Sequence, residues 1–206
     1  MKKTFWFMSM LMTFFTVSAQ AQTVEDIQKI ENYLNNIKTI KSSFVQTASN
    51  GNTTEGILYI EKPNKIRMEY APPADYMIVG DGKDIVFNDK ELDQITHIDY
   101  DDIPATLILS NKIQIDGKKL KITDFYKDSG TTEAVLEYTE NKDIGPITLI
   151  FGNQPFELKQ WKVIDTQDVE ITISLYNMER DIDLPETLFK FKQQKSPLKF
   201  NQRKGR

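Results

Sequence analysis

Few residues in this sequence could perform acid–base, nucleophilic or metal chemistry. The 206-residue chain has no cysteine and one histidine, His97, which excludes a thiol nucleophile, a disulfide framework and the usual zinc ligand sets. No Gly-x-Ser-x-Gly motif accompanies the many serines, and no glycine-rich phosphate loop precedes a Lys-Ser/Thr pair. His97 is more simply interpreted as an ordinary strand residue. These residue types therefore indicate no enzyme, no cofactor and no metal.

One acidic cluster has a possible ligand chemistry. Asp99, Asp101 and Asp102 could supply oxygen ligands to calcium, but their spacing is not that of an EF-hand loop. They precede a proline and an apolar run, and acidic side chains suit a helix start. We therefore expect a short helix over residues 101–110.

The overall charge argues against nucleic-acid binding. Because the chain carries 26 basic and 30 acidic residues, it lacks the basic excess of a nucleic-acid binder.

The first 21 residues have the pattern of a secretory signal peptide. Two lysines precede an apolar run from Phe5 to Val17, and Ala19-Gln20-Ala21 forms a small-x-small cleavage site. The run is too short for a helix spanning a ~30 Å hydrocarbon core, which argues against the alternative of an uncleaved anchor. No cysteine follows the cleavage site, so the mature chain cannot be acylated there. We expect cleavage after residue 21 and a secreted protein.

The mature chain begins with an amphipathic helix and continues as strands. Thr23 and Asp26 form a variant capping box. The apolar stripe consists of Ile27, Ile30, Leu34 and Ile37. The opposite face is expected in solvent and consists of Gln28, Glu31, Asn32 and Asn35. From residue 40 onward, alternating patterns and tight turns predict about eleven strands without βαβ units, hence one meandering antiparallel domain.

One of these strands carries a candidate binding face. Ile66, Met68 and Tyr70 alternate with Arg67 and Glu69, so the first three share a face of the sheet. Their neighbours on the preceding strand are either Leu58/Ile60 or Ile57/Tyr59, a choice that alternation leaves open. Met, Tyr and Ile suit an adaptable apolar cavity, although plain core packing explains the same pattern.

The chain ends in a basic segment, residues 192–206. It carries six basic residues and no acidic one, on a domain that is otherwise acidic. The segment is interpreted as a basic tail beyond the folded domain. It could approach anionic lipid headgroups or an acidic protein surface, with weak and salt-sensitive attraction.

An ordered series of short stretches resembles the LolA family of outer-membrane lipoprotein carriers. The series comprises Phe44-Val45-Gln46, Glu55 to Tyr70, Pro73, Ile78 to Lys83, Ile103 to Ser110, Gln160 to Asp165 and Leu184 to Phe191. The resemblance covers nearly all of residues 22–191. It implies an incomplete, curved antiparallel β-barrel of about eleven strands, covered by the N-terminal helix and a short lid helix.

The resemblance also implies a task without chemistry. Such a carrier is periplasmic. It takes the acyl chains of lipoproteins from an inner-membrane ABC transporter complex and passes them to an outer-membrane lipoprotein acceptor, and we expect it to be a monomer. The implied acyl-chain cavity is lined by Ile66, Met68, Tyr70, Leu107 and Ile108. Lys62 stands where the family often has an arginine that holds the lid by hydrogen bonds to backbone groups. The alternative is a LolA-like module that binds another envelope lipid or a lipid-derived stress signal.

Overall fold

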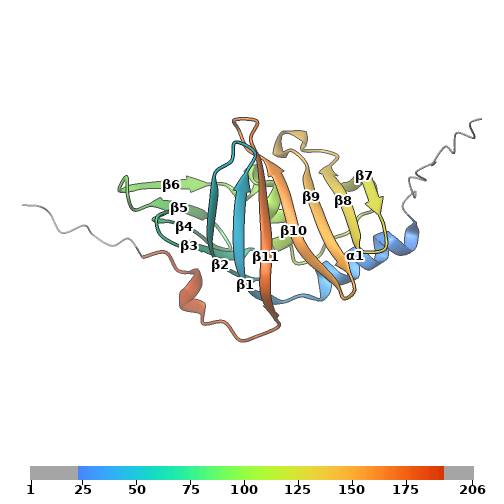
Figure 1. The fold of residues 1–206 in the computed structure, drawn as a ribbon, viewed down its shortest axis with the longest axis horizontal. Coiled ribbons are helices and arrows are strands. Elements are labelled where there is room, and N and C mark those ends of the chain that lie inside the picture. The colour runs from blue at the N-terminus through green and yellow to red at the C-terminus, as the bar shows by residue number, and fades with distance from the viewer. Residues whose placement is uncertain (1–22, 193–206) are drawn as a thin grey trace, which may run out of the picture.

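The computed structural model describes residues 23–192 (Figure 1). The predicted signal peptide lies outside the described residues, as does the predicted basic tail apart from Lys192. Within residues 23–192, no helix is long and apolar enough to span a membrane.

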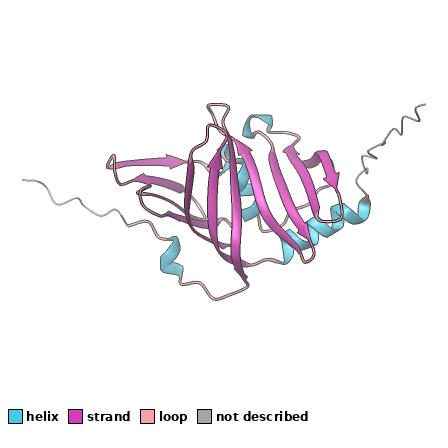
Figure 2. Cartoon of the chain, viewed as in Figure 1, coloured by secondary structure: helices cyan, strands magenta, loops and turns pink. Residues whose placement is uncertain are grey.

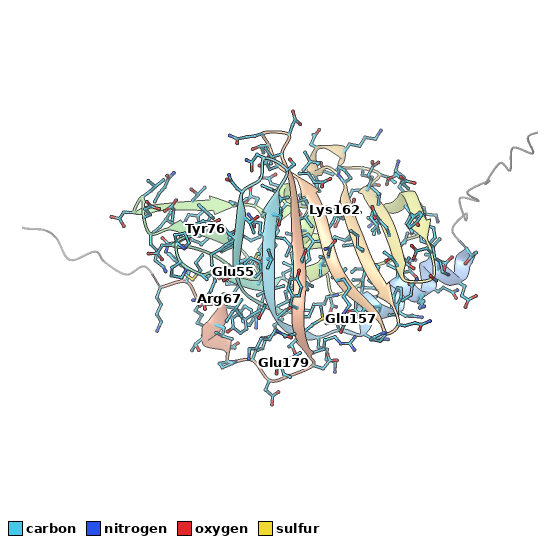
Figure 3. All side chains as sticks on the ribbon, viewed as in Figure 1. Glu55, Arg67, Tyr76, Glu157, Lys162 and Glu179 are labelled. Atoms are coloured by element: carbon cyan, nitrogen blue, oxygen red, sulfur yellow. The ribbon has the colours of Figure 1, made fainter. Side chains whose placement is uncertain are left out.

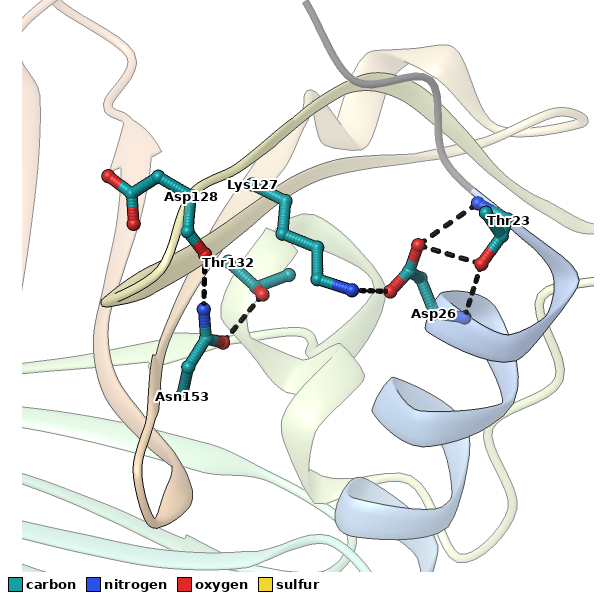
Figure 4. A network of polar contacts seen from close by, with 6 residues as sticks. All are labelled: Thr23, Asp26, Lys127, Asp128, Thr132 and Asn153. Atoms are coloured by element: carbon teal, nitrogen blue, oxygen red, sulfur yellow. Dashed lines mark hydrogen bonds and ion pairs between the residues drawn. The ribbon is translucent and has the colours of Figure 1, made fainter.

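Helix α1, Val24–Asn36, is the long helix predicted near the start of the mature chain. The predicted capping box is present: the Thr23 hydroxyl accepts from the Asp26 backbone N–H, and the Asp26 carboxylate accepts from the Thr23 backbone N–H at 3.1 Å. The Asp26 carboxylate also lies 2.5 Å from the Lys127 ammonium at the end of β7, which ties the first turn of α1 to the sheet (Figure 4).

Eleven antiparallel strands form one sheet that does not close (Figure 2). The strand patterns predicted about eleven antiparallel strands, and the resemblance implied an open barrel. In chain order they are β1 Thr39–Ala48, β2 Thr53–Glu61, β3 Lys65–Tyr70, β4 Tyr76–Asp81, β5 Ile85–Asp89, β6 Gln94–Ile98, β7 Leu120–Lys127, β8 Thr131–Tyr138, β9 Ile147–Asn153, β10 Phe156–Ile164 and β11 Glu170–Arg180. Their order across the sheet is β6-β5-β4-β3-β2-β1-β11-β10-β9-β8-β7. The first and last strands therefore pair at its centre, and β6 and β7 are its edges.

The sheet curves around the segment that links these two edge strands (Figure 1). That segment contains two short 3₁₀ helices, η1 Tyr100–Asp102 and η2 Pro104–Leu109, in place of the single short helix expected over residues 101–110. We call residues 100–109 the lid segment. Two further 3₁₀ helices are η3 Lys142–Ile144 and η4 Glu186–Phe189.

The hydrophobic core lies between the inner face of the sheet and the two covering pieces, α1 and the lid segment. From α1, Ile30 and Leu34 are almost fully buried, and Leu107, Ile108 and Leu109 of the lid segment are buried in the same cluster. Such burial, at about 25 cal/mol per Å² of apolar surface, is what holds the covering pieces on the sheet.

One expectation about α1 was wrong. Gln28 and Asn32 are exposed as expected, but Glu31 and Asn35 are half-buried. The Asn35 side chain exchanges two hydrogen bonds with the backbone of Ile113, at 2.7 and 2.8 Å, and the Glu31 carboxylate accepts from the Ile115 backbone N–H. The strand-free segment after the lid therefore runs along this face of α1, because those side chains satisfy backbone groups that no strand pairs with.

Candidate functional site

The three strand residues of the predicted cavity lie on the inner face of β3. The register pairs Ile66 with Ile60, and Met68 with Leu58. Leu58 and Ile60 are buried, whereas Ile57 and Tyr59 face the other side, which settles the choice that alternation left open. Met68 is buried in the core cluster, and Ile66 and Tyr70 pack against it half-buried.

Leu107 and Ile108 of the lid segment belong to the same cluster as Met68 and are each 3% exposed. The five residues predicted to line a cavity thus belong to or pack against one continuous core, in which protein side chains occupy the inner side of the sheet. The backbone N–H of Asn64, in the β2–β3 turn, donates to the carbonyl of Leu109 at 3.0 Å. This is the arrangement of a closed cover on an apolar face.

Lys62 makes a contact of the predicted kind, with a different partner. Its ammonium donates to the backbone carbonyl of Leu34, at 2.6 Å, in the last turns of α1 rather than in the lid segment. The last carbonyls of a helix lack intrahelical partners and carry partial negative charge, so a cation is favourable there. Burial lowers the pKa of Lys62 from 10.5 to about 8.

Tyr100 ties the start of the lid segment to two turns of the sheet. Its hydroxyl donates to the Asn64 carbonyl at 2.5 Å and accepts from the Gly82 backbone N–H at 3.0 Å. Burial raises the pKa of this phenol above its ordinary value of 10.0, so the hydroxyl keeps its proton well into alkaline pH. Gly80 leaves the space that the Tyr100 hydroxyl needs, because a Cβ there would lie 2.5 Å from it. The β2–β3 turn thus contacts both ends of the lid segment.

Sequence reasoning missed an aromatic row that continues from Tyr70. The Tyr70 ring meets Phe44 of β1 edge to face at 5.0 Å between centroids and Tyr76 of β4 at 4.2 Å, and Tyr76 lies 5.6 Å from Phe87 of β5. Phe44 and Tyr70 are two strands apart, and Gly56 stands between them in the register. Its missing side chain lets the rings touch. The sequence feature that could have indicated this contact is Gly56 itself, because a glycine inside a strand often marks a place where another group approaches the backbone closely.

Burial raises the pKa of Tyr70, whose hydroxyl donates to the Gln46 side-chain oxygen at 2.7 Å. The row thus carries a polar handle within an otherwise apolar wall.

The residues considered for chemistry are not assembled into a centre. His97 lies on edge strand β6, exposed, and its Nδ1 contacts the Asp84 carboxylate. Asp101 and Asp102 lie in the η1 turn, as predicted for a helix start. Among residues 23–192, no group of three or more His, Cys, Asp or Glu side chains could hold a metal ion.

Comparisons with known proteins identify the family of the chain. The family model described as "Outer membrane lipoprotein carrier protein LolA" matches residues 35–192. The chain belongs to the LolA family. An outer-membrane lipoprotein carrier protein of Dechloromonas aromatica (strain RCB) is 27% identical over 177 residues, covering 80% of this chain and 82% of that protein. An uncharacterized protein of Rickettsia prowazekii (strain Madrid E) is 22% identical over 192 residues, covering 93% and 88%.

A LolA superfamily protein from Nitrosomonas europaea is similar in solved structure, with a TM-score of 0.48 and 10% identity, covering 83% of this chain and 99% of that one. Proteins of the LolA family are periplasmic carriers rather than enzymes. Membership and the carrier names together support a lipoprotein-binding role for this chain.

Proposed function

We propose that this protein is a periplasmic carrier that binds the acyl chains of lipoproteins released from the inner membrane and delivers them to the outer membrane. The observation that carries the proposal is an apolar inner sheet face covered by α1 and the lid segment. Its partners in this proposal are an inner-membrane ABC transporter complex and an outer-membrane lipoprotein acceptor. It performs no catalysis.

In this proposal the acyl chains enter between the cover and the inner face of the sheet. Each CH₂ group removed from water contributes about 0.8 kcal/mol, so a lipoprotein anchor cannot cross the periplasm exposed. Opening the cover would present Ile66, Met68 and Tyr70 on one side and Leu107 and Ile108 on the other. These surfaces are apolar and lack charged anchors, which gives affinity for acyl chains without selectivity for the attached protein.

The cover is attached in a manner that suits reversible opening. At the β2–β3 turn, single hydrogen bonds from Lys62 to Leu34 and from Asn64 to Leu109 hold α1 and the lid segment, and Tyr100 adds a third link. A hydrogen bond contributes only about 0.5–1.5 kcal/mol net, or about 1.5–3 when one partner is charged. In this proposal Lys62 is the latch, and its hold on α1 is broken when cargo enters.

The test places a charge on the inner face and compares it with the same change outside. Ile66→Glu puts a carboxylate among acyl chains, at a cost of several kcal/mol. We expect this variant to lose most lipoprotein release from inner-membrane spheroplasts while its circular dichroism spectrum persists. Ile57→Glu, on the outer face of β2, is the matched control and should release lipoproteins normally. Equal release by both folded variants would refute the wall assignment.

Mass spectrometry of molecules co-purifying with the mature protein separates this proposal from its alternative. Lipoproteins bearing acylated N-termini support the carrier. Free phospholipids or glycolipids alone would favour a LolA-like module for another envelope lipid or a lipid-derived signal.

A further inference from the structure

The C-terminal segment, residues 181–192, lies along the outer face of the sheet, away from the covered inner face. The Asp181 carboxylate accepts from the Lys38 backbone N–H, and the Asp181 backbone N–H donates to the carbonyl of Thr39, the first residue of β1. Farther on, the Arg67 guanidinium donates to the Leu188 carbonyl at 2.9 Å. The next residue, Phe189, is only 2% exposed, although it packs on the outer face of the sheet. Figure 3 shows Arg67 beside this last helical turn.

The described chain ends at a hollow on the same outer face. The hollow has a volume of about 390 Å³ and is lined by Val79, Asp81, Asp84 and Val86 on one side and Lys190, Phe191 and Lys192 on the other. The floor of the hollow is apolar because it is formed by two buried valines, Val79 (1% exposed) and Val86 (7% exposed). Its rim is acidic where the sheet forms it and basic where the C-terminal segment forms it. Side chains of opposite charge thus line the two sides of the hollow, although Lys190 itself pairs with Glu186 of its own turn.

The surroundings of the hollow extend this charge contrast. Residues 75–102, which include β4, β5 and β6, contain nine acidic residues and two lysines. The backbone N–H groups of Lys83 and Asp84 hold the pKa of Asp81 below its usual value, so it is anionic at neutral pH. Asp84 also contacts the His97 imidazole. Residues 193–206 contain five basic residues and no acidic one.

The length of residues 193–206 and their attachment at Lys192 also suit binding to this hollow. Fourteen residues follow Lys192, and they can span at most about 46 Å when extended. Three neighbouring strands are only about 10 Å across. Because the segment is joined to the rim of the hollow, its effective concentration there is high, about millimolar for short linkers.

We propose that residues 193–206 bind the outer face of β4–β6 in the same molecule, with basic side chains beside Asp81 and Asp84 and Leu198 or Phe200 in the hollow. This binding is independent of the carrier function. It makes the acidic end of the sheet, rather than an anionic membrane, the main partner of the tail. Single exposed ion pairs contribute about 0–1 kcal/mol, so the bound state depends on several pairs and weakens with salt.

The absence of cysteine makes a clean probe possible. A nitroxide attached to full-length Gly205→Cys, thirteen residues beyond Lys192, should broaden the backbone amide signals of β5 and β6 several-fold more than those of β8. Salt shortens the Debye length from about 30 Å at 0.01 M to about 3 Å at 1 M, so the broadening should disappear at the higher concentration. The double variant Asp81→Asn with Asp84→Asn should abolish the broadening of β5 and β6 at low salt. Asparagine at position 81 keeps the side-chain oxygen that accepts the backbone hydrogen bonds of this turn but removes the negative charge.

The matched control is Glu140→Gln with Asp143→Asn, an equal change of charge on exposed residues between β8 and β9. It should leave the broadening intact. Equal broadening of β5 and β8, or no difference between the two double variants, would overturn the proposal. So would tail-dependent binding to phosphatidylglycerol vesicles without any broadening of β5 and β6, which would assign the tail to lipid.

Discussion

The ammonium of Lys62 lies 2.6 Å from the backbone carbonyl oxygen of Leu34 and thereby supplies helix α1 with a cation at its C-terminal end. The last turn of α1 has no basic residue of its own. A side chain from the β2–β3 turn therefore does what a Lys or Arg in the last helical turn usually does. Because the same turn also binds Leu109 and Tyr100, it connects α1, the lid segment and the inner sheet face.

Replacing Lys62 should loosen the cover. Near pH 10, where the cost of burying the ammonium is largely relieved, Lys62→Met removes one hydrogen bond, about 1 kcal/mol, which raises the open fraction about fivefold. The apparent affinity for a fluorescent fatty acid should rise by a similar factor, because less free energy is spent on opening. Lys65→Met, three residues away and paired with Glu61, is the control and should bind as the wild type does. Unchanged affinity in Lys62→Met would argue against a latch.

The depressed pKa of Lys62 makes a signed prediction for alkaline pH. The folded-state value is about 8 and the ordinary value is 10.5, so folding disfavours the charged form. The resulting loss of stability is complete below pH 8 and is relieved as pH rises toward 10.5. The free energy of unfolding of the wild type, measured relative to that of Lys62→Met by urea denaturation, should therefore increase over this interval. A flat or falling difference would contradict the burial of the ammonium.

The ion pair of Asp26 and Lys127 should contribute to stability at neutral pH. The Asp26 side chain is 7% exposed, and Asp26→Asn should lower the free energy of unfolding by about 1–3 kcal/mol, because the Lys127 ammonium is left without its partner. The double variant with Lys127→Met should recover part of the loss. Additive losses in the two single variants would show that the pair is not coupled.

Acid should remove this contribution. Burial opposes ionisation of Asp26, but hydrogen bonds from Lys127 and Thr23 outweigh it and hold the pKa below the ordinary 3.8. The stabilisation is therefore present above pH 3.8 and is lost as pH falls through the lower folded-state pKa. The stability difference between wild type and Asp26→Asn should shrink in denaturation experiments at the lowest accessible pH. A difference that grows under acid would contradict this sign.

Gly56 should tolerate no side chain. A Cβ would collide with the Glu69 carbonyl on β3 and lie 2.9 Å from the Phe44 ring. Gly56→Ala should therefore cost about 1–3 kcal/mol, the usual range for overpacking. Gly130→Ala is the control, because its Cβ would meet nothing closer than 3.7 Å. Thermal denaturation of both variants measures the contrast, and equal midpoints would show that the β2–β3 approach is looser than described.

Much of the fold could be predicted from local patterns. The capping box of Thr23 and Asp26 and the alternation of Ile66, Met68 and Tyr70 depend on residues close in sequence, and the structure confirms both. The eleven strands follow from period-two patterns and turn residues. These features are encoded locally because capping, turn geometry and side-chain alternation act over a few residues.

Other features depend on which segments meet, and only the tertiary structure decided them. Glu31 and Asn35 belong to a polar helix face, yet they bind a segment about eighty residues away that has no strand partner. The Lys62 ammonium donates to the carbonyl of Leu34 rather than to one in the lid segment. The Phe44 ring contacts the Tyr70 ring across Gly56. Periodicity determines which face a side chain occupies. Strand register and the path of the chain between elements determine which residues that side chain contacts, because these contacts join residues that no local pattern relates.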